Sequence, residues 1–223
     1  MGLGKAFRRA LPTKANRFRT QALREAVRLV PDPVASDIET VPGCLSREQG
    51  QMLCWLGKSA PAGAVVEIGS FLGKSTLWLC HGMKAGGRKG LYAIDPHNGH
   101  ERPEVETGIS DTFQAFLSNV EKGGFGGFVT PIRKLSSEAA KGWKEPIAVL
   151  WVDGSHDYQD VKSDLELFSP HVVAGGYIAM HDVSGRHFPG TRKAMLEFFR
   201  GNAAFERASG FHNMEVFRRK AGA

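Results

Sequence analysis

Short apolar runs alternate with stretches of helical periodicity over most of the chain. Five of these runs have the length of a strand and end in a polar or glycine-containing turn, namely Ala64–Gly69, Gly90–Asp95, Phe128–Arg133, Ile147–Asp153 and Tyr177–His181. The fourth run is apolar almost throughout, which is typical of a strand that is covered on both faces. The pattern therefore predicts a mainly parallel sheet with helices on both sides.

Helical patterns lie between these runs. The segment Ser46-Arg47-Glu48-Gln49 is a capping box that opens a helix through about Lys58. Apolar positions at helical spacing predict further helices at Lys74–Met83, Ser110–Glu121, Ser136–Gly142, Tyr158–Phe168 and Pro189–Arg200. The fold class that we predict is α/β, Rossmann-like and doubly wound, with a mainly parallel seven-stranded sheet.

The last two apolar segments, Phe205–Gly210 and Met214–Arg219, predict a strand pair that turns around Gly210 and closes the sheet with an antiparallel strand.

The positive charge is concentrated at the N-terminus. Residues 1–28 hold eight lysines and arginines against Glu25 alone, a charge of +7, so the rest of the chain sums to −1 within a total of +6. We therefore divide the chain into a basic N-terminal arm and linker, 1–45, and one α/β domain, 46–223. The arm could contact nucleic acid, anionic lipid or an acidic substrate, or it could pack on another subunit of a homo-oligomer.

Other features bear on the location of the protein. No apolar run approaches the length of a membrane span, and the N-terminus lacks the apolar core of a signal peptide. Cys44, Cys54 and Cys80 form neither a metal-ligand spacing nor an even disulfide set. We expect Cys54 and Cys80 to be buried thiols and the protein to be cytoplasmic.

The most informative motif lies at the end of the first predicted strand. Glu67-Ile68-Gly69-Ser70-Phe71-Leu72-Gly73 reads as a strand end, a glycine turn and the start of a helix, and Asp95 ends the next strand 26 residues after Gly69. Such a turn lets the backbone approach a ligand closely, and an acid at this spacing meets ribose hydroxyls in nucleotide-binding folds. The motif therefore predicts a ligand that contains a nucleoside.

Two other nucleotide motifs fit less well. A phosphate-binding P-loop needs four residues before its Gly-Lys-Ser, and this turn has three between its glycines. A dinucleotide fold requires Gly-x-Gly-x-x-Gly, and position 71 is a phenylalanine.

Glu67-x-Gly69-x-x-x-Gly73 followed by Asp95 resembles the first motifs of class I S-adenosylmethionine-dependent methyltransferases. The later blocks Val149–Tyr158 and Gly175–Asp182 narrow the resemblance to the metal-dependent O-methyltransferases of small molecules, a branch with macrolide-sugar and catechol enzymes. The resemblance implies that S-adenosylmethionine is the cofactor. The contacts that it implies come from Glu67, Gly69, Ser70, Phe71, Gly73, Ser75, Asp95, Ser136, Ser137 and Asp153.

The same resemblance implies a divalent metal, Mg²⁺ or Mn²⁺, at the ends of the fourth and fifth strands. Asp153 and Asp182 match the acidic ligands, whereas His181 stands where an acid is commoner, and we take it as a third ligand. His156 follows Asp153 by three residues and matches the general base of the sugar-methylating relatives. We assign no catalytic role to His97 or His100 and place them in a loop near the entrance of the site.

The hypothesis that follows is a metal-assisted O-methyltransferase whose acceptor is a hydroxyl of a small molecule, a sugar or a glycosylated natural product. A catechol-type O-methyltransferase and a non-catalytic cofactor-binding accessory protein are the alternatives. A nucleic-acid methyltransferase is disfavoured because the body is nearly neutral and lacks an Asn-Pro-Pro-Tyr-like motif after the fourth strand.

Overall fold

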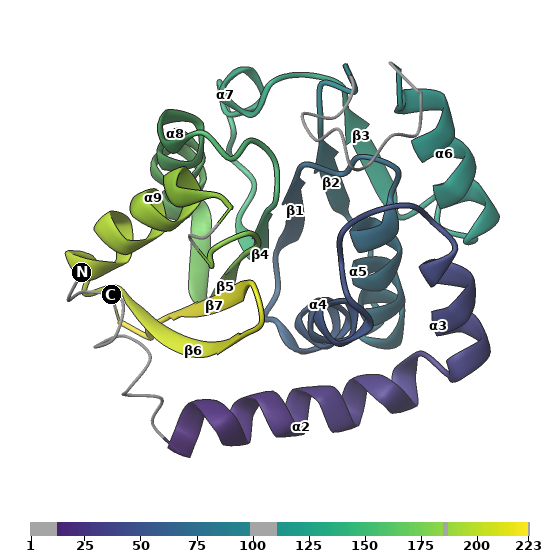
Figure 1. The fold of residues 1–223 in the computed structure, drawn as a ribbon, viewed down its shortest axis with the longest axis horizontal. Coiled ribbons are helices and arrows are strands. Elements are labelled where there is room, and N and C mark those ends of the chain that lie inside the picture. The colour runs from purple at the N-terminus through teal and green to yellow at the C-terminus, as the bar shows by residue number, and fades with distance from the viewer. Residues whose placement is uncertain (1–12, 99–110, 185–186, 223) are drawn as a thin grey trace.

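The computed structural model describes residues 13–98, 111–184 and 187–222 (Figure 1). Its centre is a seven-stranded sheet in the order β3-β2-β1-β4-β5-β7-β6. The strands are β1 (Ala64–Ile68), β2 (Leu91–Ile94), β3 (Val129–Ile132), β4 (Ile147–Val152), β5 (Val172–Met180), β6 (Phe205–Phe211) and β7 (Met214–Arg219). The first five are parallel, and β7 pairs antiparallel with both β5 and β6. The predicted fold class is confirmed.

Helices cover both faces of this sheet. Figure 1 shows α4 and α5 on one side, and α8 and α9 on the other. The helices are α2 (Thr13–Leu29), α3 (Asp32–Glu39), α4 (Arg47–Ser59), α5 (Lys74–Ala85), α6 (Phe113–Lys122), α7 (Ser136–Ala139), α8 (Tyr158–Phe168) and α9 (Pro189–Arg200), with a 3₁₀ turn at Ser169–His171. The capping box at Ser46 is present and starts α4 as predicted.

Alternation along the strands produces two hydrophobic cores. Val65 of β1 packs in the core that contains α4 and α5, whereas Val66 and Ile68 pack in the core that contains α8 and α9. Successive side chains of a strand point to opposite faces, so a strand that is apolar at every position belongs in the middle of a sheet. The same rule sends Glu67 to the α5 side, next to the start of that helix.

Two boundaries differ from the sequence prediction. Strand β5 begins at Val172 rather than at Tyr177, because residues 173–176 form a bulge in which Gly175 has a φ of 79°. A glycine pair that reads as a turn in the sequence lies inside the strand here. The β6–β7 turn lies at His212 and Asn213, and Gly210 belongs to β6, so the predicted turn position was wrong.

Helix α2 packs on the α/β body through its apolar face. Phe18 lies edge-on against Trp55 of α4, with ring centroids 4.8 Å apart, and the indole Nε1–H of Trp55 donates to Glu25 at 3.1 Å. Arg17 and Arg28 of the same helix are exposed. The boundary at residue 45 and the docking of this basic segment on a second subunit or an anionic surface stay predictions. Among the described residues, no helix has the length and hydropathy that a membrane crossing requires.

Candidate active site

The turn after β1 brings two strand ends into direct contact. Gly69 has a φ of 86°, and a Cβ at this position would lie 2.3 Å from the carbonyl oxygen of Asp153. The Asp153 N–H donates to the carbonyl of Ile68 at 2.9 Å and fixes this approach. Only glycine both adopts this left-handed backbone conformation easily and fits the available space. Gly69, which suggested a ligand in the sequence, therefore also allows β1 to pack closely against β4.

Glu67 lies behind this turn and is fully buried. Its carboxyl oxygens accept hydrogen bonds from the hydroxyls of Ser75 and Thr76, at 2.5 and 2.6 Å, in the first turn of α5. Burial raises the pKa of Glu67 to about 8, and the two hydroxyl donors oppose that rise only in part. The observed contacts of Glu67 are therefore with α5.

Asp95, at the end of β2, organises the backbone of two loops. One of its oxygens accepts the Phe71 N–H at 2.8 Å, and the other accepts the His97 N–H at 2.7 Å. Phe71 has a φ of 45°, which is unusual for a residue other than glycine. The hydrogen bond to Asp95 holds Phe71 in this conformation, so the acid couples the glycine turn to the end of β2.

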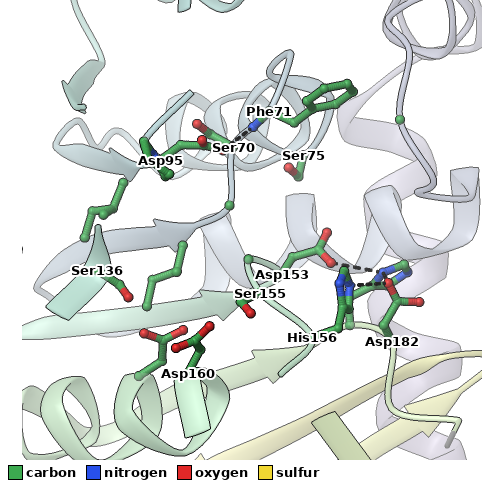
Figure 2. A pocket seen from close by; sticks show the side chains of 18 of the residues that line it. Ser70, Phe71, Ser75, Asp95, Ser136, Asp153, Ser155, His156, Asp160 and Asp182 are labelled. Atoms are coloured by element: carbon green, nitrogen blue, oxygen red, sulfur yellow. Dashed lines mark hydrogen bonds and ion pairs between the residues drawn. The ribbon is translucent and has the colours of Figure 1, made fainter. Parts of the chain in front are cut away.

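A cavity of about 310 Å³ crosses the carboxyl ends of the strands (Figure 2). Between β1 and β4 the strand order reverses, and this is the position where open α/β sheets bind ligands. Eight of the predicted cofactor residues line the cavity, namely Gly69, Ser70, Phe71, Ser75, Asp95, Ser136, Ser137 and Asp153. The other two predicted cofactor residues, Glu67 and Gly73, do not line the cavity.

The predicted metal ligands converge at one end of this cavity. One ligand atom from each of Asp153, His181 and Asp182 lies within 4.8 Å of the others. The His181 Nδ1 lies 3.2 Å from Asp153 and 3.4 Å from Asp182. Burial alone would lower the pKa of His181, but the two carboxylates outweigh it and raise that pKa to about 10. The imidazolium then supplies positive charge between two acids.

His156 lies beside this cluster. Its Nε2 is 2.9 Å from Asp182 Oδ2 (Figure 2). Its ring stacks on that of Phe188 with centroids 3.9 Å apart. A carboxylate can only accept, so Nε2 carries a proton in this contact. The arrangement places an imidazole, oriented by an acid and an aromatic ring, at the cavity wall.

Asn213 fixes Asp182 from the β6–β7 turn. Its side-chain amide donates to Asp182 Oδ1 and accepts the Ser184 N–H at 2.6 Å, and its carbonyl accepts the Val183 N–H at 3.3 Å. Asp182 itself has a φ of 54°. A residue 31 positions further along the chain therefore holds the loop after β5, and no spacing in the sequence pointed to it.

Other lining residues were also missed. Asp160 and Asp164 of α8 line the cavity. Lys74 of α5 and Cys44, which precedes α4, line it as well. The two acids are four residues apart and share a helix face, a signal that could have been read from the sequence. His97 lies in the loop after β2, between the lining residues Pro96 and Asn98, but it is 1% exposed and does not line the cavity itself. Its Nδ1 lies 2.9 Å from the Thr112 hydroxyl. His100 lies outside the described residues.

Comparisons with known proteins give the family. A family model described as a methyltransferase domain matches residues 66–183, which is just over half of the chain. Solved structures of similar fold include an O-methyltransferase from Bacillus cereus in complex with S-adenosylhomocysteine, at 18% identity, 90% and 91% coverage of the two chains and a TM-score of 0.61. They also include the O-methyltransferase NovP, at 13% identity, 91% and 99% coverage and a TM-score of 0.66.

A third structure of similar fold is the O-methyltransferase TomG from Streptomyces achromogenes in complex with S-adenosylmethionine, at 17% identity, 90% coverage of each chain and a TM-score of 0.60. Identities this low show the fold, and the family match shows the membership. The predicted resemblance to class I S-adenosylmethionine-dependent methyltransferases is thereby confirmed: the chain belongs to the methyltransferase-domain family.

Proposed function

We propose that this protein is a metal-assisted O-methyltransferase that moves a methyl group from S-adenosylmethionine to a hydroxyl of a small molecule, a sugar or a glycosylated natural product. The observation that carries the proposal is the convergence of Asp153, His181 and Asp182 beside His156 at one end of the cavity. S-adenosylmethionine would supply the methyl group, and a divalent cation would lower the pKa of the acceptor hydroxyl.

The cavity fits the cofactor in its charge and in its shape. Five aspartates and a single lysine are among the lining residues, a balance that favours a ligand with a positive centre such as a sulfonium. The Gly69 turn has no room for a side chain, so the ligand would meet bare backbone there. Asp95 retains acceptor capacity beyond its two backbone donors, as a pair of ribose hydroxyls would require.

The donor set at the other end fits a divalent cation. Two carboxylates and an imidazole suit Mn²⁺ well and Mg²⁺ less well, because Mg²⁺ prefers oxygen ligands. Asp153, His181 and Asp182 would hold the ion, and its charge would take the place of the proton on His181. The excess of acid over base at this end of the cavity is what such an ion would balance.

His156 is the residue that would accept the acceptor's proton. Asp182 takes the Nε2–H, which leaves the Nδ1 lone pair as the base, and stacking on Phe188 keeps the ring from rotating away. General-base catalysis of this kind typically contributes about 10²–10⁴ in rate. The Asp-x-x-His spacing favours a sugar over a catechol, and the neighbour TomG, which is involved in tomaymycin synthesis, supports a small-molecule acceptor.

The test is a methyl-transfer assay on a glycoside with vicinal hydroxyls and on a catechol, each with Mn²⁺, with Mg²⁺ and with excess EDTA. We expect transfer to the glycoside that EDTA abolishes and Mn²⁺ restores. The His156→Ala variant should lose about 10²–10⁴ in turnover and still bind S-adenosylhomocysteine. Asp153→Asn and Asp182→Asn should lose Mn²⁺ binding, measured by calorimetry, together with activity.

Each result that contradicts part of the proposal is distinct. Full activity in EDTA would refute the metal role and leave a metal-independent methyltransferase. Transfer to the catechol alone would replace the sugar by a catechol acceptor. Cofactor binding with no transfer to any hydroxyl compound would favour the accessory protein.

A further inference from the structure

A row of arginines runs along the outward face of α2. Arg17, Arg24 and Arg28 follow one another at intervals of seven and four residues, and positions with this spacing lie on one face of a helix. All three side chains are exposed, whereas Ala22 and Ala26 on the opposite face are buried in the core. We call these three arginines the basic stripe. At a rise of about 1.5 Å per residue, the stripe extends over about 16 Å of helix.

The charge of the basic stripe is not paired within the described chain. The ion pairs among the described residues involve other basic side chains, and none of them includes an arginine of the stripe. Glu25 is the one acid of α2, and its two oxygens accept hydrogen bonds from the Gln21 amide and the Trp55 indole, each at 3.1 Å. The stripe therefore presents its positive charge outward.

The basic stripe lies on the outside of the molecule. Figure 1 shows α2 on the side opposite to α7, whose first residues line the cavity. Val27 lies on the flank of the stripe and is 51% exposed, so an apolar side chain stands beside the charges. Small ligands bind in concave sites. A helix on the outer surface, with basic side chains and one exposed aliphatic group, is better suited to a broad partner.

Exposed acids near α2 discriminate between broad anionic partners. Asp32 and Asp37 of α3 follow the helix, and Glu206 belongs to β6, the strand against which α2 packs. A nucleic-acid duplex encloses a bound helix between two rows of phosphates, and these acids would repel such phosphates. A second copy of the chain, docked about a two-fold axis, would set one stripe against the other. A flat anionic surface can contact the stripe alone.

We propose that the basic stripe binds the surface of membranes that contain anionic lipids, so that the protein lies on the membrane without crossing it. Guanidinium groups pair with lipid phosphates through two parallel hydrogen bonds, and Val27 adds an apolar contact at the level of the headgroups. Lys5, Arg8 and Arg9 precede the helix in the sequence and carry charge of the same sign. The binding is electrostatic, so it is reversible and weakens with salt. The proposal is independent of methyl transfer and of the metal.

The experiment measures co-sedimentation of the full chain with vesicles of phosphatidylcholine, alone or with about 30% phosphatidylserine, at about 0.1 M NaCl. We expect binding to the anionic vesicles alone, and its loss at about 0.5 M NaCl. Each arginine near an anionic leaflet contributes about fivefold to binding, so Arg17→Gln/Arg24→Gln/Arg28→Gln should bind about 100-fold more weakly. Lysine at the same three positions should retain most of the binding, because it keeps the charge.

The matched control changes three exposed lysines before and after α7, on the side of the molecule away from the stripe. Lys134→Gln/Lys141→Gln/Lys144→Gln removes the same net charge and should keep vesicle binding within about twofold of the wild type. Thermal melting checks that each variant is folded.

Four results would overturn the proposal. The first is a wild type that does not bind the anionic vesicles. The second is an equal loss in the two triple glutamine variants, which would show a response to net charge alone. Tighter binding to duplex DNA than to the vesicles at the same salt would assign the stripe to nucleic acid instead. A changed oligomeric state of the stripe variant on size-exclusion chromatography, without vesicles, would assign the stripe to a contact between subunits.

Discussion

Replacing Glu67 with glutamine should change how the stability of the protein depends on pH. Glu67 is fully buried, and its two oxygens face the hydroxyls of Ser75 and Thr76. Glutamine has the shape and hydrogen-bonding capacity of the protonated acid, with one acceptor and one donor end. Either hydroxyl can rotate to accept from the amide. The substitution therefore removes the titration and preserves the packing around it.

The sign of the effect follows from the raised pKa. Between about pH 4.5 and 8 the unfolded chain has Glu67 ionised while the folded protein keeps it protonated. The unfolded state binds fewer protons in this range, so the wild type loses stability as pH rises. One proton corresponds to about 1.4 kcal/mol per pH unit. The difference in the free energy of unfolding between Glu67→Gln and the wild type should therefore shift in favour of the variant by at least about 2 kcal/mol from pH 5 to pH 8.

Urea unfolding at half-unit steps from pH 5 to pH 9 measures this difference, and the comparison between variants cancels the titration of all other groups. The curves should become parallel only toward pH 9, about one unit above the folded-state pKa, where both states have lost the proton. Glu166→Gln, on an exposed face of α8, should track the wild type throughout. A constant offset between Glu67→Gln and the wild type over the whole range would show that Glu67 is already ionised in the folded protein, and the reasoning from burial would be wrong.

Three further predictions concern the cavity. Asp95→Asn puts an amide NH₂ against one of two backbone N–H groups, so S-adenosylhomocysteine should bind about tenfold more weakly by calorimetry; unchanged affinity would remove Asp95 from the site. Cys44 lines the cavity and is exposed while the other two thiols are buried, so a thiol reagent should modify one cysteine in the native protein, and more slowly with S-adenosylhomocysteine bound. A rate of Cys44 modification that S-adenosylhomocysteine does not change would place the ligand elsewhere. Asn213→Ala removes the amide that holds Asp182, and turnover should fall about tenfold with cofactor affinity intact; a fall in affinity alone would contradict this positioning role.

The architecture and much of the cavity wall follow from local patterns. The apolar runs gave the five parallel strands, because a strand covered on both faces must be apolar at consecutive positions. Acids that follow such strands must gather at one edge of the sheet, which is why Asp95, Asp153 and Asp182 could be placed together before any contact was known.

What the sequence did not reveal depends on contacts between distant segments. The bulge at Gly175 looks like a turn because a glycine pair has the same local preferences in both settings. The inward turn of Glu67 toward α5 depends on the side of the sheet that β1 shows to that helix. Asn213 reaches Asp182 only because β7 pairs with β5, a pairing that brings residues 31 positions apart into contact.

The sequence of α2 is rich in arginine, so its composition does not reveal that the helix has an apolar face. Phe18 covers Trp55 and lies 6.1 Å from the ring of Tyr177 in β5, so the helix shields a core that begins in the sheet. Net charge describes the exposed side of such a helix and says nothing of the buried side.

The two ends of the cavity favour different chemical groups of a ligand. At the β4–β5 end, acids surround an imidazole and require positive charge, which a cation or the proton on His181 supplies. At the β3 end, Asp164 is 2% exposed and its Oδ1 has no hydrogen-bond partner among the described residues, so this oxygen favours a hydrogen-bond donor. A molecule with a cationic sulfur at one end and an aromatic amine at the other meets both demands, and strand spacing fixes the length between them. The preference for such a ligand thus arises from where the sheet order places each acid and how far each is from water.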